Sequence, residues 1–349
     1  MNGRPGVGLI GSGNIAPEYL RTLTGSASVA VKAVSDMDPD RAAATAALFG
    51  LEAARPEELL ARPDVDIIVN LTVPAAHAQV SRAALVAGKH VHSEKPIATT
   101  RGDALDLLRL ARAAGLLITC GPDTFMGAAG LRARTLLAAG AIGKVVGASA
   151  TFAGSGPESW HPNPDFFFAP GAGPLLDMGP YYVTHLVKLL GPVARVSGLA
   201  RASRSERRPT AGPNAGRAIP VSTPTHVTAL LEFESGPVVT LTCSFDMAGS
   251  TQPHIELYGE SGSMTLPDPN RFGGSLSHIR SGEPAWTEEA CEQPPEVARG
   301  VAVIDLAECI VSGDEPAASG SDALHVLDIL LCILESAASG QHVTPSARP

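Results

Sequence analysis

The chain has 349 residues, of which 44% are hydrophobic and 17% charged, and its formal net charge is −9. This composition is typical of a globular protein with room for two domains, and it excludes a disordered chain. The negative charge, with no basic helix or zinc-finger spacing to offset it, argues against a nucleic-acid partner.

Five scattered cysteines favour a reducing compartment. They contain no C-x-x-C pair, so neither a disulfide framework nor a structural zinc site is expected, and we predict no bound metal. The N-terminus has no signal-peptide profile, and the apolar stretch Val326–Leu334 is short and holds Asp328. We therefore expect a cytoplasmic protein that does not contact a membrane.

The first 120 or so residues alternate short β-branched runs with alanine- and leucine-rich runs. Strands are expected at Val7–Ile10, Val29–Val34, Val65–Leu71, His90–Ser93 and Leu116–Cys120. Helices are expected from about Ile15 and at Pro39–Phe49, Ala75–Ala87 and Thr100–Ala114. Such alternation predicts a doubly wound parallel sheet, a Rossmann domain that we assign to residues 1–122.

The pattern changes after Cys120. Helices are expected at Gly127–Ala139, Leu175–Leu190, Val301–Val311 and Ala323–Ala338, and a strand at Val145–Phe152. From Val193 to Leu266 extended runs alternate with turn residues. Residues 123–349 are therefore predicted to form an α+β domain with a large, mostly antiparallel open sheet and helices on one face.

A glycine-rich turn between the first strand and the first helix predicts a dinucleotide site. It comprises Gly11, Ser12, Gly13, Asn14 and Ile15, with an alanine at the third glycine position of the fingerprint. Gly11 suits the tight turn, Gly13 allows a pyrophosphate to approach the backbone, and the helix N-terminus favours its charge.

Asp36 follows the second strand, about 20 residues after this turn, where an acid binds the adenosine ribose. A carboxylate accepts hydrogen bonds from the ribose hydroxyls and repels a 2′-phosphate. The sequence therefore favours NAD over NADP. Asp38 and Asp40 are interpreted instead as acids at the start of the following helix.

Several segments together resemble the glucose–fructose oxidoreductase/inositol dehydrogenase (Gfo/Idh/MocA) family. They are the glycine turn, N-L-T-V-P-A-A-H at 70–77, G-K-H-V-H-S-E-K-P at 88–96 and L-L-D-M-G-P-Y-Y at 175–182. The resemblance continues through the C-terminal run at 320–340. It implies a Rossmann domain followed by a sheet domain, a homodimer or homotetramer formed through that sheet, and NAD(P)-dependent chemistry on sugars or cyclitols.

The resemblance makes Lys95 the catalytic-site lysine, next to the nicotinamide and the reacting oxygen. An ammonium there hydrogen-bonds that oxygen and stabilises the negative charge that develops on it. Four more residues are expected beside the cofactor: Thr72, Pro74, His77 and Glu94. His77 can equally be a hydrogen-bonded histidine at a helix start.

Asp177 matches the family's aspartate in the second domain, but Tyr181 stands where many members carry a histidine as general acid/base. We expect Tyr181 or Lys95 to relay the proton, with Asp177 orienting the substrate hydroxyl. A tyrosine can do so if a nearby cation such as Lys95 lowers its pKa. His161 and His185 are competing bases, although the stripe that His185 shares with Asp177 and Tyr181 can simply face solvent.

The remaining candidates concern the substrate. Asp123, with Thr124, is placed where family members begin to line the substrate side, and Trp160 and His161 lie in an aromatic loop that suits either sugar stacking or packing. His90 and His92 are interpreted as core or edge histidines rather than metal ligands. The arginines at 201, 204, 207, 208 and 217 are interpreted as a solvated or subunit-facing loop, with contact to an anionic substrate as the alternative.

The leading hypothesis is therefore an NAD-dependent enzyme that transfers a hydride to or from a carbinol carbon of a sugar, glycoside or cyclitol. Two alternatives stay open. One is a glycoside hydrolase that retains NAD and uses transient oxidation. The other is a non-catalytic dinucleotide sensor, against which Lys95 and Asp177 argue, since a sensor needs neither.

Overall fold

The computed structural model describes residues 4–161, 163–210, 214–294 and 297–349, which form two compact units. The first unit holds the described residues up to Gly127 together with those of 293–327, and the second holds 128–292 and 328–348. The expected boundary at 122/123 lies close to the first change of unit. Residues 293–327 belong to the first unit, whereas the sequence predicted that all residues after 122 belong to the second.

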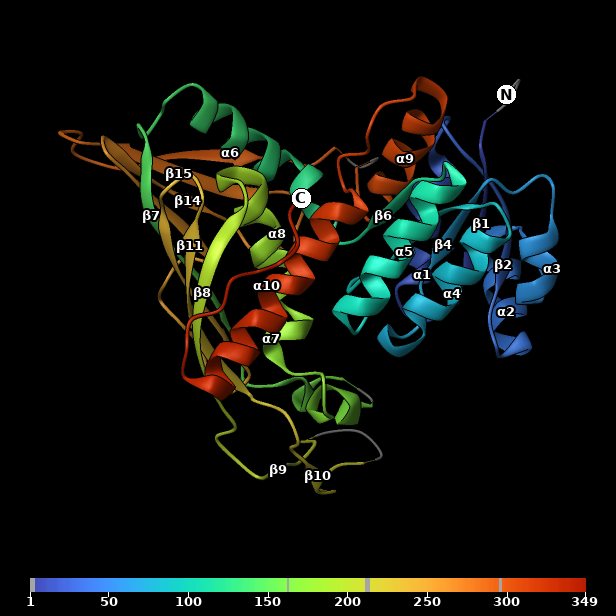
Figure 1. Ribbon diagram of the computed structural model, residues 1–349, viewed down its shortest axis with the longest axis horizontal. Coiled ribbons are helices and arrows are strands. Elements are labelled where there is room, and N and C mark those ends of the chain that lie inside the picture. Colours follow the sequence, from blue (N-terminus) through green and yellow to red (C-terminus); the bar gives the residue numbers. More distant parts are fainter. Residues whose placement is uncertain (1–3, 162, 211–213, 295–296) are drawn as a thin grey trace. The chain divides into compact units, whose positions relative to one another are not determined.

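The first unit is built on a six-stranded parallel sheet in the order β3-β2-β1-β4-β5-β6 (Figure 1). Its strands are β1 (Gly6–Ile10), β2 (Ala30–Ser35), β3 (Glu52–Ala53), β4 (Ile67–Asn70), β5 (His90–Ser93) and β6 (Ile118–Cys120). This is the strand order of a Rossmann domain. The predicted doubly wound parallel sheet is confirmed, with β3 as an additional short edge strand.

Helices cover both faces of this sheet: α1 (Ala16–Gly25), α2 (Pro39–Phe49), α3 (Pro56–Ala61), α4 (Pro74–Val86), α5 (Arg101–Ala114) and α9 (Val301–Ser312). On one face α1, α2 and α9 share a core with β1 and β4, to which α9 contributes Val303, Leu306 and Ala307. On the other face α3 packs against β1, and α4 and α5 pack side by side. The sequence predicted α9 as a helix but assigned it to the second domain.

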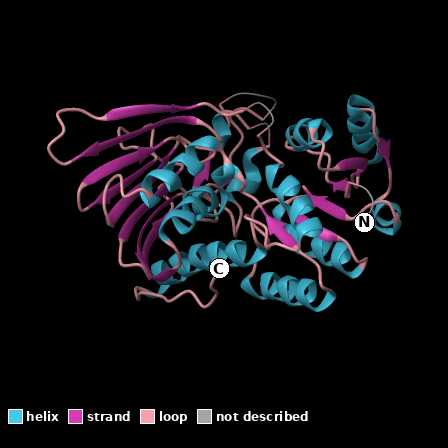
Figure 2. Cartoon of the chain, turned by 90° about the horizontal axis from the view of Figure 1, so that it is seen from above, coloured by secondary structure: helices cyan, strands magenta, loops and turns pink. Residues whose placement is uncertain are grey.

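The second unit is built on an eight-stranded sheet in the order β16-β15-β14-β13-β7-β12-β11-β8 (Figures 1 and 2). Its strands are β7 (Val145–Ala153), β8 (Val193–Arg201), β11 (His226–Phe233), β12 (Val238–Ser244), β13 (Ile255–Gly259), β14 (Gly262–Leu266), β15 (Gly274–Arg280) and β16 (Thr287–Cys291). Only β7 and β12 pair in parallel, so the predicted mostly antiparallel sheet is confirmed. β9 (Glu206–Arg207) and β10 (Ile219–Pro220) form a separate two-stranded sheet.

Helices pack on one face of the large sheet, as expected. They are α6 (Ala128–Ala138), α7 (Pro174–Asp177), α8 (Gly179–Leu190) and, from Asp328 onward, α10 (Gly320–Ser339). Alternate residues of β11 and β12 are buried, as a sheet with one covered face requires. Among the described residues no helix combines the length and apolarity needed to cross a membrane.

The single helix expected over Leu175–Leu190 is instead two helices, with Met178 between them. The cause is Pro180, which has no N–H to donate to the carbonyl of Leu176 in the preceding turn, so the helix hydrogen bonds are interrupted here. Proline is tolerated in the first turn of a helix, so α8 begins there. Asp177 therefore ends α7, whereas Tyr181 lies on α8.

Candidate active site

The turn after β1 has the geometry that its glycines predict. Gly11 has a φ of +105°, and a Cβ added to it would lie 2.6 Å from the backbone of Leu71. Its N–H donates to the carbonyl of Ser35 over 2.8 Å. Both the positive φ and the close approach require glycine at this position.

Gly13 presents open backbone at the start of α1. A Cβ built on Gly13 would meet no heavy atom within 4 Å, and Asn14 beside it is exposed, while Ile15 packs against the core of the unit. The N–H groups of Ala16 and Glu18 donate to the carbonyls of Gly13 and Ile15, and this first turn carries the positive end of the helix dipole. This combination of accessible backbone and helix N-terminus fits the pyrophosphate of a dinucleotide.

Asp36 lies at the end of β2, beside the glycine turn. Its Oδ2 accepts from the Ser12 N–H over 2.7 Å, and its Oδ1 accepts from the Asp38 N–H over 3.0 Å. Arg41 reaches to 3.8 Å from the same carboxylate. Asp38 accepts from the first N–H groups of α2, as expected of an acid at a helix start. The structure thus places an acid where a ribose would bind, together with an arginine.

The turn after β4 brings Thr72 and His77 together. Thr72 donates its hydroxyl to Oδ1 of Asn70 over 2.7 Å, and its carbonyl faces Nε2 of His77 at 2.9 Å. Pro74 opens α4 and is exposed. His77 is buried, and its Nδ1 lies 2.6 Å from the carbonyl oxygen of Pro96. Burial lowers the pKa of His77. Both ring nitrogens of His77 therefore face backbone carbonyl oxygens, and the neutral ring, which has one N–H, donates to one of them.

Glu94 and Lys95 follow β5, so they lie at the carboxyl edge of the sheet, as do the glycine turn after β1 and Thr72 after β4. Ligands of doubly wound sheets bind at this edge. Oε2 of Glu94 accepts from the backbone N–H of Lys95 over 2.9 Å. Burial alone would raise the pKa of Glu94, but the charges of Lys95 and Arg299 outweigh it and hold that pKa below its usual value.

Tyr19 was not singled out from the sequence, yet its hydroxyl donates to Oε1 of Glu94 over 2.9 Å. The same hydroxyl lies 3.3 Å from Nε2 of His92, whose Nδ1 lies 2.9 Å from the hydroxyl of Thr119. Burial lowers the pKa of His92 to about 4. Tyr19 also packs in the core of the unit, so its position along α1 is that of an apolar residue. Its hydrogen bond with Glu94, 75 residues away, gives no local signal in the sequence.

Asp123 does not have the surroundings expected of a residue on the substrate side. It is fully buried, and its Oδ2 accepts from the N–H groups of Gly300 and Ala302, at 2.8 and 3.5 Å. Its carboxyl therefore holds the start of α9, and Thr124 beside it is also buried. Burial raises the pKa of Asp123 to about 6.

In the second unit, Tyr181 and His185 lie one turn apart on α8. Both are buried, with Tyr181 6% exposed, so the solvent-facing stripe considered from the sequence is wrong. Nδ1 of His185 lies 2.9 Å from the carbonyl oxygen of Tyr181, and burial lowers the pKa of His185 to about 4. A histidine so placed is a poor proton acceptor near neutral pH.

Asp177 lies near Cys243 of β12. Burial raises the pKa of the Cys243 thiol, and the negative charge of Asp177 raises it further.

The aromatic loop has both a packed and an exposed part. The ring of His161 makes edge contacts with Trp160, Phe166 and Phe167, with centroids 5.2 to 5.4 Å apart. Its Nδ1 accepts from the Asn163 N–H over 3.1 Å, which leaves Nε2 for other contacts. Trp160 is 71% exposed and therefore available to stack on a ligand.

Arg207 contradicts the interpretation of its loop as solvated. It is 4% exposed and pairs with Glu158 over 2.7 Å and with Asp246, while also donating to the carbonyl of Phe245. A buried guanidinium requires such a set of acceptors. The other four arginines, at 201, 204, 208 and 217, are exposed as expected.

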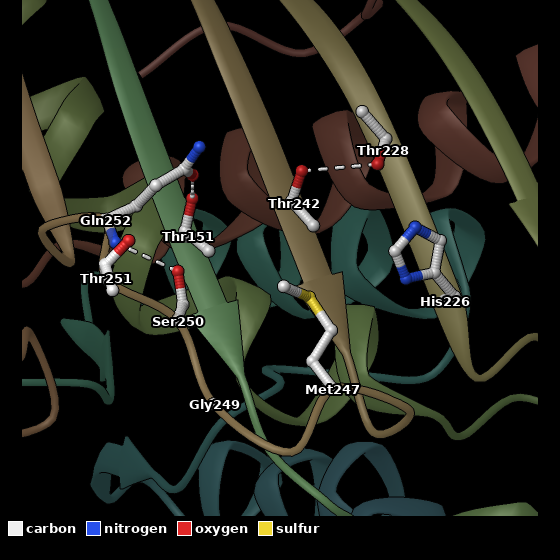
Figure 3. A pocket seen from close by; sticks show the side chains of 9 residues that line it. All are labelled: Thr151, His226, Thr228, Thr242, Met247, Gly249, Ser250, Thr251 and Gln252. Carbon is white, nitrogen blue, oxygen red and sulfur yellow. Dashed lines mark hydrogen bonds between the residues drawn. The ribbon is translucent and has the colours of Figure 1, made fainter.

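A shallow pocket of about 630 Å³ lies on the helix-free face of the large sheet (Figure 3). Thr151, Thr242 and Thr228 stand opposite one another on the neighbouring strands β7, β12 and β11. Thr228 and Thr242 are hydrogen-bonded, and Thr151 donates to Gln252. This pocket contains none of the residues that the sequence assigned to catalysis.

Comparison with known proteins agrees with the two-unit fold. Residues 6–121 match the oxidoreductase family with an NAD-binding Rossmann fold, and residues 131–265 match the GFO/IDH/MocA C-terminal domain. The chain is 34% identical over 265 residues to the dTDP-3,4-didehydro-2,6-dideoxy-alpha-D-glucose 3-reductase of Streptomyces antibioticus, covering 74% of each chain. It is 28% identical to inositol 2-dehydrogenase 3 of Saccharopolyspora erythraea, covering 76% of this chain and 74% of the relative.

A solved levoglucosan dehydrogenase, in complex with NADH and L-sorbose, has the same fold. The TM-score is 0.85 at 21% identity, covering 99% of this chain and all of that one. The matched segments identify the family of this Rossmann fold. Its sheet carries the glycine turn after β1, Asp36 after β2 and Lys95 after β5. The chain belongs to the Gfo/Idh/MocA family of NAD(P)-dependent oxidoreductases.

Proposed function

We propose that this protein is a sugar oxidoreductase that acts at a carbinol or carbonyl carbon of a sugar, glycoside or cyclitol, with NAD as cofactor. The observation that carries the proposal is the position of Lys95, which follows β5 at the sheet edge where the dinucleotide turn follows β1. A cation placed there serves the reacting oxygen of a substrate beside the cofactor. When bound, the nicotinamide supplies the hydride donor or acceptor.

Each proposed catalytic residue has a separate task. The Lys95 ammonium donates a hydrogen bond to the reacting oxygen and stabilises negative charge on it. The Tyr181 hydroxyl gives a proton to that oxygen during reduction or takes it during oxidation, and Asp177 accepts a hydrogen bond from a substrate hydroxyl. Trp160, with His161 beside it, offers an aromatic surface to a sugar ring.

The direction to test first is reduction of a ketosugar, in which the Tyr181 hydroxyl would donate its proton to the reacting oxygen. The relative from S. antibioticus is by name a reductase of a dTDP-linked didehydro sugar, which supports testing nucleotide-linked ketosugars first.

NAD is the proposed cofactor because Asp36 stands at the end of β2. Its carboxylate would accept the ribose hydroxyls and repel a 2′-phosphate. Arg41, 3.8 Å from that carboxylate, is the one feature nearby that favours NADP, since an arginine there accommodates the phosphate. Asp36 accepts a hydrogen bond from the Ser12 N–H of the glycine turn. We therefore give Asp36 more weight than Arg41 in the choice of cofactor.

Absorbance at 340 nm tests the function in both directions. NAD or NADP is offered with a panel of sugars, glycosides and cyclitols, and NADH or NADPH with ketosugars, including nucleotide-linked ones. A change with one substrate class supports the oxidoreductase and identifies that class. A flat trace in both directions, with NAD still bound by calorimetry, would refute the proposal and favour the NAD-retaining hydrolase or the sensor.

We also propose that the protein forms a homodimer or homotetramer through the helix-free face of the large sheet. Leu199 of β8 stands opposite Thr228 on this face and is 76% exposed, and Leu230, two residues along β11, is 51% exposed. Large apolar side chains on an open sheet are typical of an interface. The five cysteines are buried and form no disulfide among the described residues, which supports a reducing cytoplasm as the location.

A further inference from the structure

The segment Glu94–Pro96 holds Lys95 between two anchored neighbours. On one side, the carboxylate of Glu94 accepts the backbone N–H of Lys95 itself. On the other side, the carbonyl oxygen of Pro96 lies 2.6 Å from the ring of His77. The position of the Lys95 backbone therefore depends on what fixes Glu94 and what fixes Pro96.

Glu94 is fixed by a hydrogen-bond chain whose direction can be worked out. A carboxylate accepts only, so the Tyr19 hydroxyl gives its proton to Glu94, 2.9 Å away. The contact between Tyr19 and His92 must then use the Nε2 proton of His92, since the phenol has none left. The neutral ring of His92 accepts at Nδ1 from Thr119. Every proton in this chain points toward Glu94.

Pro96 is fixed by a histidine that spans two turns. The two ring nitrogens of His77 face the carbonyl oxygens of Pro96 and Thr72, at 2.6 and 2.9 Å. His77 is fully buried on α4, so its ring cannot turn toward solvent instead. The neutral ring has one N–H, which we assign to Nδ1 because its contact with Pro96 is the shorter one, and Nε2 faces the turn after β4.

We propose that Tyr19 and His77 are positioning residues for Lys95: from α1 and α4 they hold Glu94 and Pro96, and thereby keep the lysine at the reacting oxygen. The inference rests on the proposed function of Lys95. Both residues belong to helices that begin at turns assigned to the cofactor, Tyr19 on α1 and His77 on α4. Neither residue touches the reacting atoms in this proposal.

The first test is Tyr19→Phe, which removes one hydroxyl and keeps the ring in the core. We expect kcat to fall about tenfold while the dinucleotide Kd and the substrate KM change less than twofold. Wild-type kcat in a folded Tyr19→Phe protein would overturn the role of Tyr19. Lys95→Ala is measured alongside. If that variant keeps full turnover, the assignment of Lys95 has failed, and the positioning role is refuted with it.

Unfolding of the cofactor-free protein gives a second readout. Tyr19 helps to hold the pKa of Glu94 below its usual value, so the stability that Glu94 contributes is present at neutral pH and is lost as pH falls through the folded pKa. The deficit of Tyr19→Phe in unfolding midpoint should therefore be largest at neutral pH and shrink below about pH 4. Tyr182→Phe is the matched control, because it removes another buried hydroxyl, which is bonded to His254 rather than to a carboxylate. A Tyr19→Phe deficit that does not change with pH would contradict the Glu94 link.

His77→Asn tests the other side of the lysine. A shorter side chain cannot reach both carbonyls, and we expect a severalfold lower kcat with little change in dinucleotide Kd. Ser81→Ala is the control on the same helix, because the hydroxyl of Ser81 accepts from Asn70 over 3.0 Å. Equal effects of the two substitutions on kcat would show a general effect of α4 and would overturn the role of His77.

Discussion

Lys95 is the residue on which the proposed chemistry depends most directly. Lys95→Ala should lower kcat by an amount equivalent to roughly 2–4 kcal/mol in barrier if the ammonium stabilises the developing oxyanion. Dinucleotide affinity should change much less, because the glycine turn and Asp36 remain. Steady-state kinetics and calorimetry measure the two effects separately. Lys144→Ala, at an exposed lysine of the second unit, is the control, and unchanged turnover in Lys95→Ala would remove the lysine from the mechanism.

Asp36 decides the cofactor in the proposal, and its contacts suggest a sharper substitution than alanine. Asp36→Asn keeps an oxygen that can accept the Ser12 N–H, so the glycine turn stays supported while the negative charge is lost. The ratio of kcat/KM with NADP to that with NAD should rise about tenfold, since one repulsive charge near a phosphate is removed. Arg41→Ala should lower the same ratio. A wild-type protein that prefers NADP would refute the assignment.

At the scale of elements, Asp123 links stability to pH through α9. A carboxyl whose folded pKa, about 6, exceeds its unfolded value of about 3.9 binds a proton in the folded state that the unfolded state releases. Its contribution to stability therefore falls as pH rises between those values. Asp123→Asn keeps an acceptor for the start of α9 without this charge.

We expect Asp123→Asn to gain stability relative to wild type by roughly 2–3 kcal/mol between pH 4 and pH 7. Denaturant unfolding at several pH values measures the difference. Asp64→Asn is the control of opposite sign, because its hydrogen bond with Arg62 lowers the pKa of Asp64 and its loss should destabilise the protein at neutral pH. A constant difference between wild type and Asp123→Asn across this range would contradict the buried charge.

Most elements could be predicted from sequence because local patterns specify them. Apolar runs marked the longer strands from β1 to β14 but not the two-residue strands β3, β9 and β10. Helix periodicity marked α1 to α10 with the exception of the short α3. β15 and β16 lacked such a signal, since each buries only one large or sulfur-bearing side chain, Leu276 or Cys291. The break at Met178 was readable from Gly179 and Pro180, but the apolar pattern of the flanking residues concealed it.

Only those site residues that belong to a sequence motif could be predicted. The glycine turn, Asp36, Glu94 and Lys95 carry their own sequence signals, and the structure places all of them at one sheet edge. Tyr19 had no such signal, because a tyrosine on the apolar side of a helix reads as core. Arg207 was misread for the related reason that its acids, Glu158 and Asp246, lie far away in sequence.

At the scale of the whole molecule, the helix-free sheet face predicts self-association. Leu199→Glu combined with Leu230→Glu should shift the protein toward monomer, because two charges would have to lose their water in the interface. Light scattering after size exclusion measures the mass. Leu48→Glu, at an exposed leucine of the first unit, is the control. A wild-type protein that is already monomeric at micromolar concentration would contradict the interface.

The position of α9 has a consequence for how the protein is made. Val303, Leu306 and Ala307 complete the core around β1 and α1, so the cofactor-binding unit needs residues from the last sixth of the chain. A ribosome adding about 5–20 residues per second requires roughly 15 to 60 s to reach them. Until then, the part of the sheet face that α9 covers beside α1 and α2 stays exposed. The enzyme should therefore depend on chaperone protection during translation, and it should gain dinucleotide affinity only when synthesis is nearly finished.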